Sequence, residues 1–240
     1  MEELTFYPLE RTPALVSACM YLEEQGVRVS SCGDNTVTHL LVPIPKFDSH
    51  DLAELRCRLR NDITLVGGNL SEGIDLLRDP HYLAENAAIT ADCAIRLAGQ
   101  GLKTVFRGLP VLIIGWGRIG KCLASQLHCM GAQVTVAARK ETDRGTLVSL
   151  GYHAISTDAL ETHLPLSRII FNTVPCEMIT EAQSQLCRRD CLKIDLASNR
   201  GIAGDGVLWA RGLPGKMAPE AAGRLIGSAA LRLARKEAAK

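Results

Sequence analysis

The sequence predicts an α/β protein in which a doubly wound parallel Rossmann sheet follows a smaller N-terminal α/β domain. Residues 111–139 carry the first observation: an apolar run enters a glycine triplet, an amphipathic stretch follows, and a second apolar run begins at Val134. This order is typical of strand, phosphate loop, helix and strand. The second observation is a pair of near-continuous apolar runs, Ile169–Asn172 and Leu192–Leu196, which indicate parallel strands covered on both faces.

Residues 1–84 are expected to form the smaller domain. Its predicted elements are a strand at Leu4–Tyr7, a helix at 13–25, and strands at Val27–Ser31, His39–Ile44 and Ile63–Val66. The helix opens with a proline, which suits a first helical turn, and ends before Gly26. Because PLERTP follows the first strand in place of a glycine loop, only one nucleotide site is expected in the chain.

A helix with an Ala, Ile and Leu face is expected to connect the two domains over residues 85–103. The larger domain then occupies residues 104–240. After its strand–helix–strand core we expect helices at 142–150, 158–163 and Pro219–Lys236, and strands at Tyr152–Ile155, Ile169–Asn172, Leu192–Leu196 and Val207–Ala210. Such alternation with right-handed crossovers generates a doubly wound sheet.

Composition excludes several classes of function. The 240 residues carry a formal net charge of +1, which gives no electrostatic reason to expect nucleic acid or a membrane surface as partner. The N-terminal sequence MEELTFYPLE has no basic-then-apolar signal pattern, so the chain is expected to stay in the cytoplasm. The 9 cysteines form no CxxC and the 6 histidines no HExxH, so no metal site is expected.

The glycine loop predicts a dinucleotide site. Gly115 allows the tight turn, Gly117 lets the backbone approach a pyrophosphate, and Gly120 lets the helix lie close to the strand. The pyrophosphate would accept hydrogen bonds from free N–H groups at the start of the helix. The expected loop comprises Gly115, Trp116, Gly117, Arg118, Ile119 and Gly120. The alternative is a glycine-tightened turn that holds no ligand.

The end of the second strand indicates which dinucleotide is bound. NAD-preferring sites usually place Asp or Glu there, whereas this chain has Arg139 followed by Lys140. A guanidinium matches the charge and shape of a 2′-phosphate, so NADP is expected and NAD is the alternative. An exposed basic turn without a ligand is the simpler explanation that remains.

Three further segments are expected at the carboxyl ends of the strands, where ligands bind in such sheets. They are Asn172–Pro175, Asp195–Arg200 and Gly212–Pro219, the last expected as a rigid loop. From these segments we expect cofactor contacts from Asn172, Thr173, Val174, Pro175, Asp195 and Ser198. The alternative for each segment is ordinary turn chemistry, because Asn, Pro and Gly end strands whatever the function.

These motifs resemble those of a known family. NTVP, DLAS and GLPGKMAPEAAGRLIG, behind GWGRIGK and VTVAAR, are similar to the A subunits of dipicolinate synthase from spore-forming bacteria. The resemblance covers nearly the whole chain and is strong from about residue 104. The matching positions are Gly115, Gly117, Arg118, Gly120, Arg139, Asn172, Thr173, Pro175, Asp195, Ser198, Gly215 and Pro219. The chain departs from the family in a shorter N-terminal domain and in ITADC, which replaces a segment resembling PTVEG.

The resemblance implies an NAD(P)-linked oxidation of dihydrodipicolinate to dipicolinate, performed together with a flavoprotein B subunit, and two α/β domains with a cleft between them. This reaction forms an aromatic ring, so the protein mainly orients the ring, excludes water and accepts one proton. Arg200 and Lys216 are the cations expected to bind the two substrate carboxylates. Asp92 is the candidate proton acceptor, and Asp195 is expected to fix the loops.

Two alternatives to this function stay open. One is a free-standing NADP-dependent dehydrogenase or reductase of another small acid, because fold does not settle function. The other is a non-catalytic nucleotide-binding subunit that positions a flavoprotein. A homo-oligomer, most simply a dimer, is expected because the short N-terminal domain is not expected to bury all its apolar surface alone.

Overall fold

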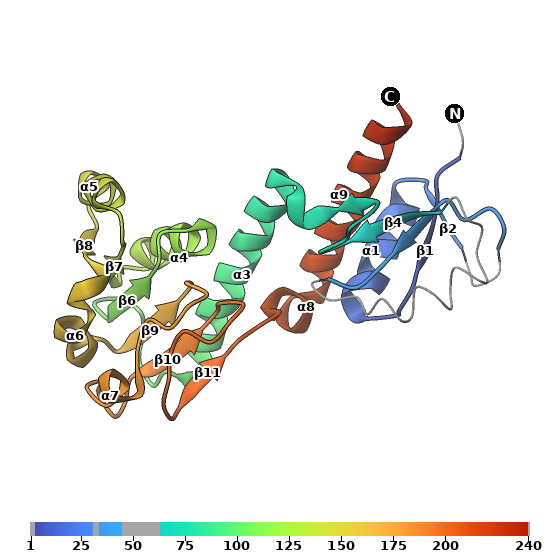
Figure 1. The fold of residues 1–240 in the computed structure, drawn as a ribbon. Helices are drawn as coiled ribbons and strands as arrows, with labels where there is room; N and C mark the ends of the chain where they lie inside the picture. The colour runs from blue at the N-terminus through green and yellow to red at the C-terminus, as the bar shows by residue number, and fades with distance from the viewer. Residues whose placement is uncertain (1–2, 31–33, 45–62, 240) are drawn as a thin grey trace. The chain divides into compact units, whose positions relative to one another are not determined.

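The computed structural model describes residues 3–30, 34–44 and 63–239, which form two parallel sheets with helices (Figure 1). The predicted α/β fold class is confirmed. The chain divides into two compact units: unit 1 comprises Met1–Ile89 with Pro214–Lys240, and unit 2 comprises Thr90–Leu213. Within the described ranges, no helix is both long and apolar enough to span a bilayer.

Unit 1 is built on a five-stranded parallel sheet in the order β2-β1-β3-β4-β5. Its strands are β1 (Thr5–Pro8), β2 (Arg28–Val29), β3 (His39–Leu41), β4 (Thr64–Gly67) and β5 (Ile74–Asp75). The four strands expected here are present and β5 is additional; Ser31, the expected end of the second strand, lies outside the described residues. The expected helix is α1 (Pro13–Glu24), whose first turn is capped by the Thr12 side chain.

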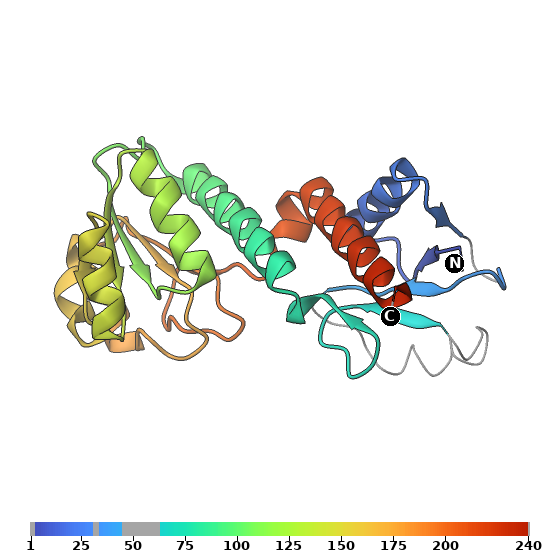
Figure 2. The same cartoon turned by 90° about the horizontal axis from the view of Figure 1, so that it is seen from above.

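One face of this sheet packs against two helices, α1 and α9 (Pro219–Ala238), which lie side by side (Figure 2). Phe6, Leu15, Leu22 and Ile226 belong to their shared core. The close approach depends on small residues of α9. A Cβ at Gly223 would lie 2.2 Å from the Ala14 carbonyl oxygen.

This packing corrects the expected domain boundary. From the sequence, residues 104–240 were expected to form one Rossmann domain. The structure instead assigns residues 214–240 to unit 1, because the small-residue stripe of α9 is filled by the backbone of α1. The segment expected as a rigid loop before α9 also contains a short helix, α8 (Leu213–Met217).

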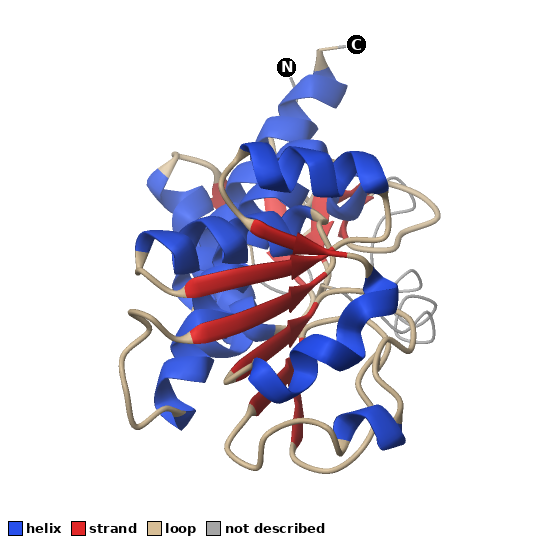
Figure 3. Ribbon diagram, turned by 90° about the vertical axis from the view of Figure 1, so that its left-hand side faces the viewer, coloured by secondary structure: helices blue, strands red, loops and turns tan. Residues whose placement is uncertain are grey.

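Unit 2 contains a six-stranded parallel sheet in the order β11-β10-β9-β6-β7-β8, with helices on both faces (Figure 3). The strands are β6 (Pro110–Ile114), β7 (Gln133–Ala137), β8 (His153–Ile155), β9 (Ile169–Asn172), β10 (Leu192–Asp195) and β11 (Val207–Trp209). This is the doubly wound Rossmann order, and the chain reverses direction across the sheet between β6 and β9. All six strands expected from the sequence are present.

The helices of unit 2 follow the expected alternation. They are α4 (Arg118–Cys129), α5 (Glu141–Ser149), α6 (Leu160–His163) and α7 (Glu181–Ser184). The expected connecting helix is α3 (Pro80–Gly101), which begins in unit 1 and continues into unit 2. Helix α7 was not expected; it begins with a capping box between Thr180 and Gln183.

Candidate nucleotide-binding site

The glycine loop lies where β6 and β9 end, at the switch point of the unit 2 sheet. Gly115 has a φ of +104°, and a Cβ there would lie 2.4 Å from Thr173 Oγ1 in the loop that follows β9. A Cβ at Gly120 would lie 2.2 Å from the Gly115 carbonyl oxygen. Both glycines are therefore required by close packing at the crossing of strand, loop and helix.

Gly117 differs from the other two glycines. It precedes the first residue of α4 with φ −79° and ψ −170°, which is an ordinary extended conformation. A Cβ at this position would meet nothing within 4 Å, and no side chain caps the helix. The open space in front of the free N–H groups fits a pyrophosphate, which such a helix terminus attracts through hydrogen bonds and its dipole.

Two other residues of the loop have different surroundings. The Trp116 ring packs edge-on against Tyr152, with 5.9 Å between ring centroids, and the Lys121 ammonium lies 5.7 Å from its centroid. Its side chain is therefore engaged within the protein, and we expect its contribution to a ligand to come from the backbone. Ile119 is half-buried and Arg118 is exposed.

Arg139 and Lys140 are exposed just beyond the end of β7. Their turn is held by Arg144, whose Nη1 donates to the Ala138 carbonyl at 2.9 Å and to the Arg139 carbonyl at 2.8 Å. Within the part of the chain that the structure describes, neither basic side chain is engaged by a carboxylate. Both are available to an anionic group at the strand end.

Asn172 and Asp195 lie at the ends of neighbouring strands and are fully buried. Asn172 Nδ2 donates to Asp195 Oδ1 at 2.9 Å and to the Val174 carbonyl at 3.0 Å. Asp195 Oδ1 also accepts from the Ala197 N–H, and its Oδ2 accepts from the N–H groups of Gly201 and Ile202.

This network gives both side chains a structural role. They were expected to contact the cofactor directly, but their polar atoms are committed to the loops that follow β9 and β10. Asp195 fixes the loops, as expected, and Asn172 shares that role. Sequence alone showed polar residues at strand ends but not that their side chains turn inward.

The remaining expected cofactor contacts come from the same two loops. Thr173 is half-buried, and its Oγ1 donates to the Ile114 carbonyl at 3.0 Å, tying the β9 loop to β6. Val174 is half-buried, whereas Pro175 and Ser198 are exposed. A ligand at the switch point could therefore reach these positions without displacing a buried side chain.

Arg200 belongs to a cation–aromatic cluster that sequence reasoning missed. Its guanidinium carbon lies 5.1 Å from the centroid of Trp209, and that of Arg211 lies 5.4 Å from the same ring. Trp209 Nε1 donates to the Ala197 carbonyl at 3.1 Å, which fixes the indole. Two guanidinium groups are thus gathered at the carboxyl end of β11. The closeness of Trp209 and Arg211 in the sequence was the feature that could have indicated this cluster.

Arg200 and the other two expected catalytic residues, Asp92 and Lys216, are exposed. Asp92 lies on the part of α3 that belongs to unit 2, and Lys216 lies on α8, in the segment assigned to unit 1. The described residues include no group of three or more His, Cys, Asp or Glu side chains placed to hold a metal ion.

Comparison with known proteins agrees with this geometry. Residues 94–193 match the NAD-binding domain of D-isomer specific 2-hydroxyacid dehydrogenases. Strand order, glycine loop and this match together indicate a domain that binds a nicotinamide dinucleotide.

More particularly, the chain resembles the A subunit of dipicolinate synthase, as its motifs predicted. It is 30% identical to the Bacillus subtilis form of that protein over 156 residues, which cover 62% of this chain and 52% of the relative. It is 26% identical to a glutamyl-tRNA reductase of Halalkalibacterium halodurans over 193 residues, covering 70% of this chain and 42% of the relative. The chain thus spans about half the length or less of these curated relatives.

Solved structures show the same fold. The dipicolinate synthase structure from Bacillus subtilis superimposes with a TM-score of 0.82 at 19% identity, covering 100% of this chain and 99% of that one. Its counterpart from Bacillus halodurans gives 0.79 at 20% identity, with 96% of each chain covered. A transhydrogenase from Sinorhizobium meliloti gives 0.72 at 13% identity, covering 98% of this chain and 94% of that one.

Proposed function

We propose that this chain carries out the NADP-dependent oxidation of dihydrodipicolinate to dipicolinate, in the role of the dipicolinate synthase A subunit, working with a flavoprotein B subunit. The observation that carries the proposal is the joint resemblance, in sequence and in fold, to that protein. The open, uncapped start of α4 beside Gly117 supports a bound dinucleotide. We also propose a homo-oligomer, most simply a dimer.

The residues divide into those that fix the site and those that would act on the substrate. Asn172 and Asp195 hold the two loops, while Thr173, Val174, Pro175 and Ser198 would border the nicotinamide half of the cofactor. The bound nicotinamide supplies a hydride acceptor. Oxidation of the dihydropyridine releases one hydride and one proton, so the protein needs one basic group.

The substrate carboxylates call for cationic partners. In this proposal Arg200 and Lys216 bind the carboxylates and Asp92 accepts the proton. Trp209 holds the Arg200 guanidinium by stacking, which leaves the N–H groups at its edge free to donate to a carboxylate. Arg211, on the same indole, is an additional candidate for this role.

The cofactor preference is the first test. Arg139 and Lys140 stand where a carboxylate would select NAD, so NADPH is expected to bind more tightly than NADH. A charge-assisted contact is worth roughly 1.5–3 kcal/mol, or about ten- to a hundredfold in affinity. Titration calorimetry on wild type and Arg139→Ala measures this directly, with Arg107→Ala as the control because that residue precedes β6, away from the carboxyl ends of the strands. Equal affinities of the wild type for both dinucleotides would refute the preference.

The substrate is the second test. Dihydrodipicolinate, generated in place from its hydroxylated precursor, is supplied with NADP⁺, and dipicolinate is followed by its ultraviolet absorbance. Arg200→Ala and Lys216→Ala are each expected to lower kcat/KM roughly thirtyfold, which corresponds to a loss of about 2 kcal/mol in transition-state stabilisation. The affinity for NADP should be unchanged. Asp92→Asn should lower turnover in the same way. Arg107→Ala and Lys103→Ala, which change cations before β6, are the matched controls.

The outcomes separate the proposed reaction from its alternatives. Dipicolinate formed by the isolated chain excludes a non-catalytic role, whereas product that appears only with the flavoprotein indicates a shared active site or a positioning role. Absence of product in both cases would leave an oxidoreductase of another small acid. Normal turnover by both cation variants would remove the carboxylate assignment while leaving the reaction in place.

A further inference from the structure

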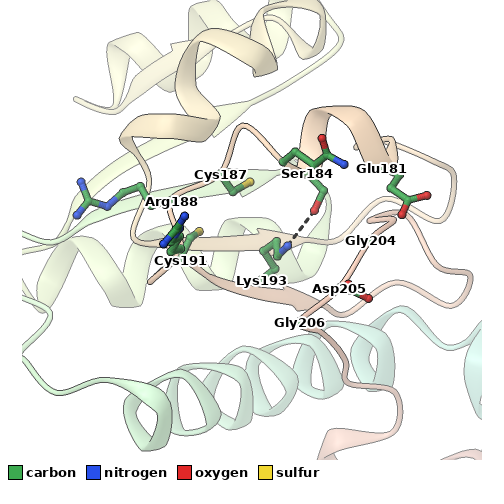
Figure 4. A pocket seen from close by; sticks show the side chains of 11 residues that line it. Glu181, Ser184, Cys187, Arg188, Cys191, Lys193, Gly204, Asp205 and Gly206 are labelled. Carbon is green, nitrogen blue, oxygen red and sulfur yellow. Dashed lines mark hydrogen bonds between the residues drawn. The ribbon is translucent and has the colours of Figure 1, made fainter.

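A pocket of about 410 Å³ lies in unit 2, beside the start of β10. Its lining includes Ser184, Cys187, Cys191, Lys193 and Gly204. Figure 4 shows the two cysteines and Lys193 close together on the wall of this pocket. Since Leu192 begins β10 and Asp195 ends it, the pocket lies toward the amino end of the strand, away from the glycine loop.

A tight turn brings the two cysteines together. The Cys187 N–H donates to the Ser184 carbonyl at 3.3 Å as the chain leaves α7, and the Cys191 N–H donates to the Arg188 carbonyl at 3.0 Å. Cys191 Sγ donates to the Leu192 carbonyl at 3.8 Å, and both thiols line the wall of the same pocket. Cys191 is 9% exposed, and Cys187 is half-buried at the pocket wall, where a small reagent can reach it.

The charges around the pair are mixed. Lys193 Nζ donates to Ser184 Oγ at 2.8 Å, which holds the ammonium in the pocket near both sulfur atoms. Arg188 is neutralised by Asp190 at 2.9 Å. The other charged side chains on the lining are Glu181, Arg189 and Asp205.

We propose that Cys187 and Cys191 form a peroxide-reactive dithiol that closes reversibly to an intrachain disulfide. In the first step the Cys187 thiolate attacks one oxygen of hydrogen peroxide; the S–O bond forms, the O–O bond breaks, and hydroxide leaves. In the second step the Cys191 sulfur attacks the Cys187 sulfur; the S–S bond forms, the S–O bond of Cys187 breaks, and the leaving hydroxide takes the Cys191 proton to become water. Two electrons pass from the thiols to peroxide, and two equivalents of a small thiol return the pair to the reduced state.

The ionisation of the pair agrees with this assignment. The neighbouring Cys191 thiol and the charge of Lys193 lower the pKa of Cys187 to about 7, against the opposing effect of burial. The neighbouring Cys187 thiol, together with burial, raises the pKa of Cys191. Elsewhere in the chain burial raises the pKa of Cys19 to about 11 and also raises that of Cys93. Cys187 is thus the attacking sulfur and Cys191 the resolving one.

Alkylation kinetics test the thiolate. The purified full chain is treated with limiting iodoacetamide between pH 5.5 and 9.5, and labelling at each cysteine is followed by peptide mass spectrometry. We expect the rate at Cys187 to rise with a midpoint near pH 7, and in Cys191→Ser to move toward the ordinary thiol value of about 8.5. The exposed Cys129 and Cys176 are internal references. If the wild-type chain shows the same pH midpoint of alkylation at Cys187 as at Cys129 and Cys176, the proposal is overturned.

Peptide mapping tests the disulfide. Trypsin cleaves after Arg188 and Arg189, so the bond would join the peptide 169–188 to the peptide 190–193. Because the first peptide also carries Cys176, the experiment uses Cys176→Ser as its background. After stoichiometric peroxide we expect this cross-linked pair, its disappearance with dithiothreitol, and its absence in Cys187→Ser. Oxidation that ends at Cys187 sulfinic acid, or leaves both peptides unlinked, would overturn the proposal.

Discussion

At the scale of single residues, the three glycines of the nucleotide loop have different surroundings. A substitution at one of them can therefore affect nucleotide binding without affecting folding. Gly117 has an ordinary φ and open space where a Cβ would lie. Gly117→Val is therefore expected to fold normally, with an unchanged melting temperature, and to lose NADPH binding because its side chain occupies the approach of the pyrophosphate. Fluorescence titration with NADPH and thermal unfolding give the two measurements.

Gly120→Ala is the matched control for this variant. Its Cβ would come within 2.2 Å of the Gly115 carbonyl oxygen, so strand and helix must separate. We expect a loss of stability of about 1–3 kcal/mol, seen as a lower melting temperature. Normal NADPH binding by Gly117→Val would show that this loop does not hold the phosphates.

The same scale shows where prediction from sequence stops. The glycine spacing could be interpreted because its three positions have fixed geometric roles. The inward-facing role of Asn172 could not be predicted, because a polar residue at a strand end faces a ligand or the protein according to hydrogen bonds with segments far along the chain. Trp209 and Arg211 were missed for a similar reason, since their stacking with Arg200 depends on the pairing of β10 with β11.

At the scale of elements, Asp79 joins the first turn of α3 to α9 within unit 1. Its Oδ2 accepts from the Tyr82 N–H at 2.8 Å in the first turn of α3, and its carboxylate pairs with Arg232 of α9. Asp79→Ala is expected to lower the free energy of unfolding by about 2 kcal/mol, through loss of a helix cap and a charge-assisted hydrogen bond. Denaturant titration measures the loss. Glu24→Ala is the control: its ion pair with Arg224 is half exposed on both sides and should cost under about 1 kcal/mol.

The Asp79 contribution also has a defined pH dependence. Although burial opposes it, the hydrogen bonds from Arg232 and the Tyr82 N–H lower the pKa of Asp79 below that of an unfolded aspartate. The stabilisation is therefore complete above about pH 4 and is lost as the pH falls through the lower folded pKa. In Asp79→Ala the acid side of the stability profile should be flatter. An unchanged slope would show that this carboxylate does not contribute.

The regular elements of both units could be predicted because each has a hydrophobic pattern of sufficient length. The two helices that were missed, α7 and α8, have four and five residues, too few for a periodic pattern. The sequence did contain the capping box of α7 at Thr180 and Gln183. The helix that packs against α9 could not be predicted, because small residues such as Gly223 indicate close packing but do not identify the neighbouring element.

At the scale of the whole molecule, unit 2 is continuous in sequence and unit 1 is not. Residues 80–213 are expected to fold alone and to bind NADPH, because they contain the complete six-stranded sheet and its helices. Residues 1–89 alone are expected to remain largely unfolded, because the core of unit 1 needs Ile226, Ala230 and their neighbours on α9. Circular dichroism and NADPH titration of the two fragments test this. Cooperative unfolding of residues 1–89 by themselves would contradict it.

The discontinuity of unit 1 has a consequence for how the protein is made. During translation, residues 1–89 leave the ribosome well before residues 214–240 exist, and at about 5–20 residues per second the delay is on the order of ten seconds. Throughout that interval Phe6, Leu15 and Leu22 lack the helix that covers them. The nucleotide-binding half can finish folding first, and the nascent N-terminal half must meanwhile be kept from aggregating.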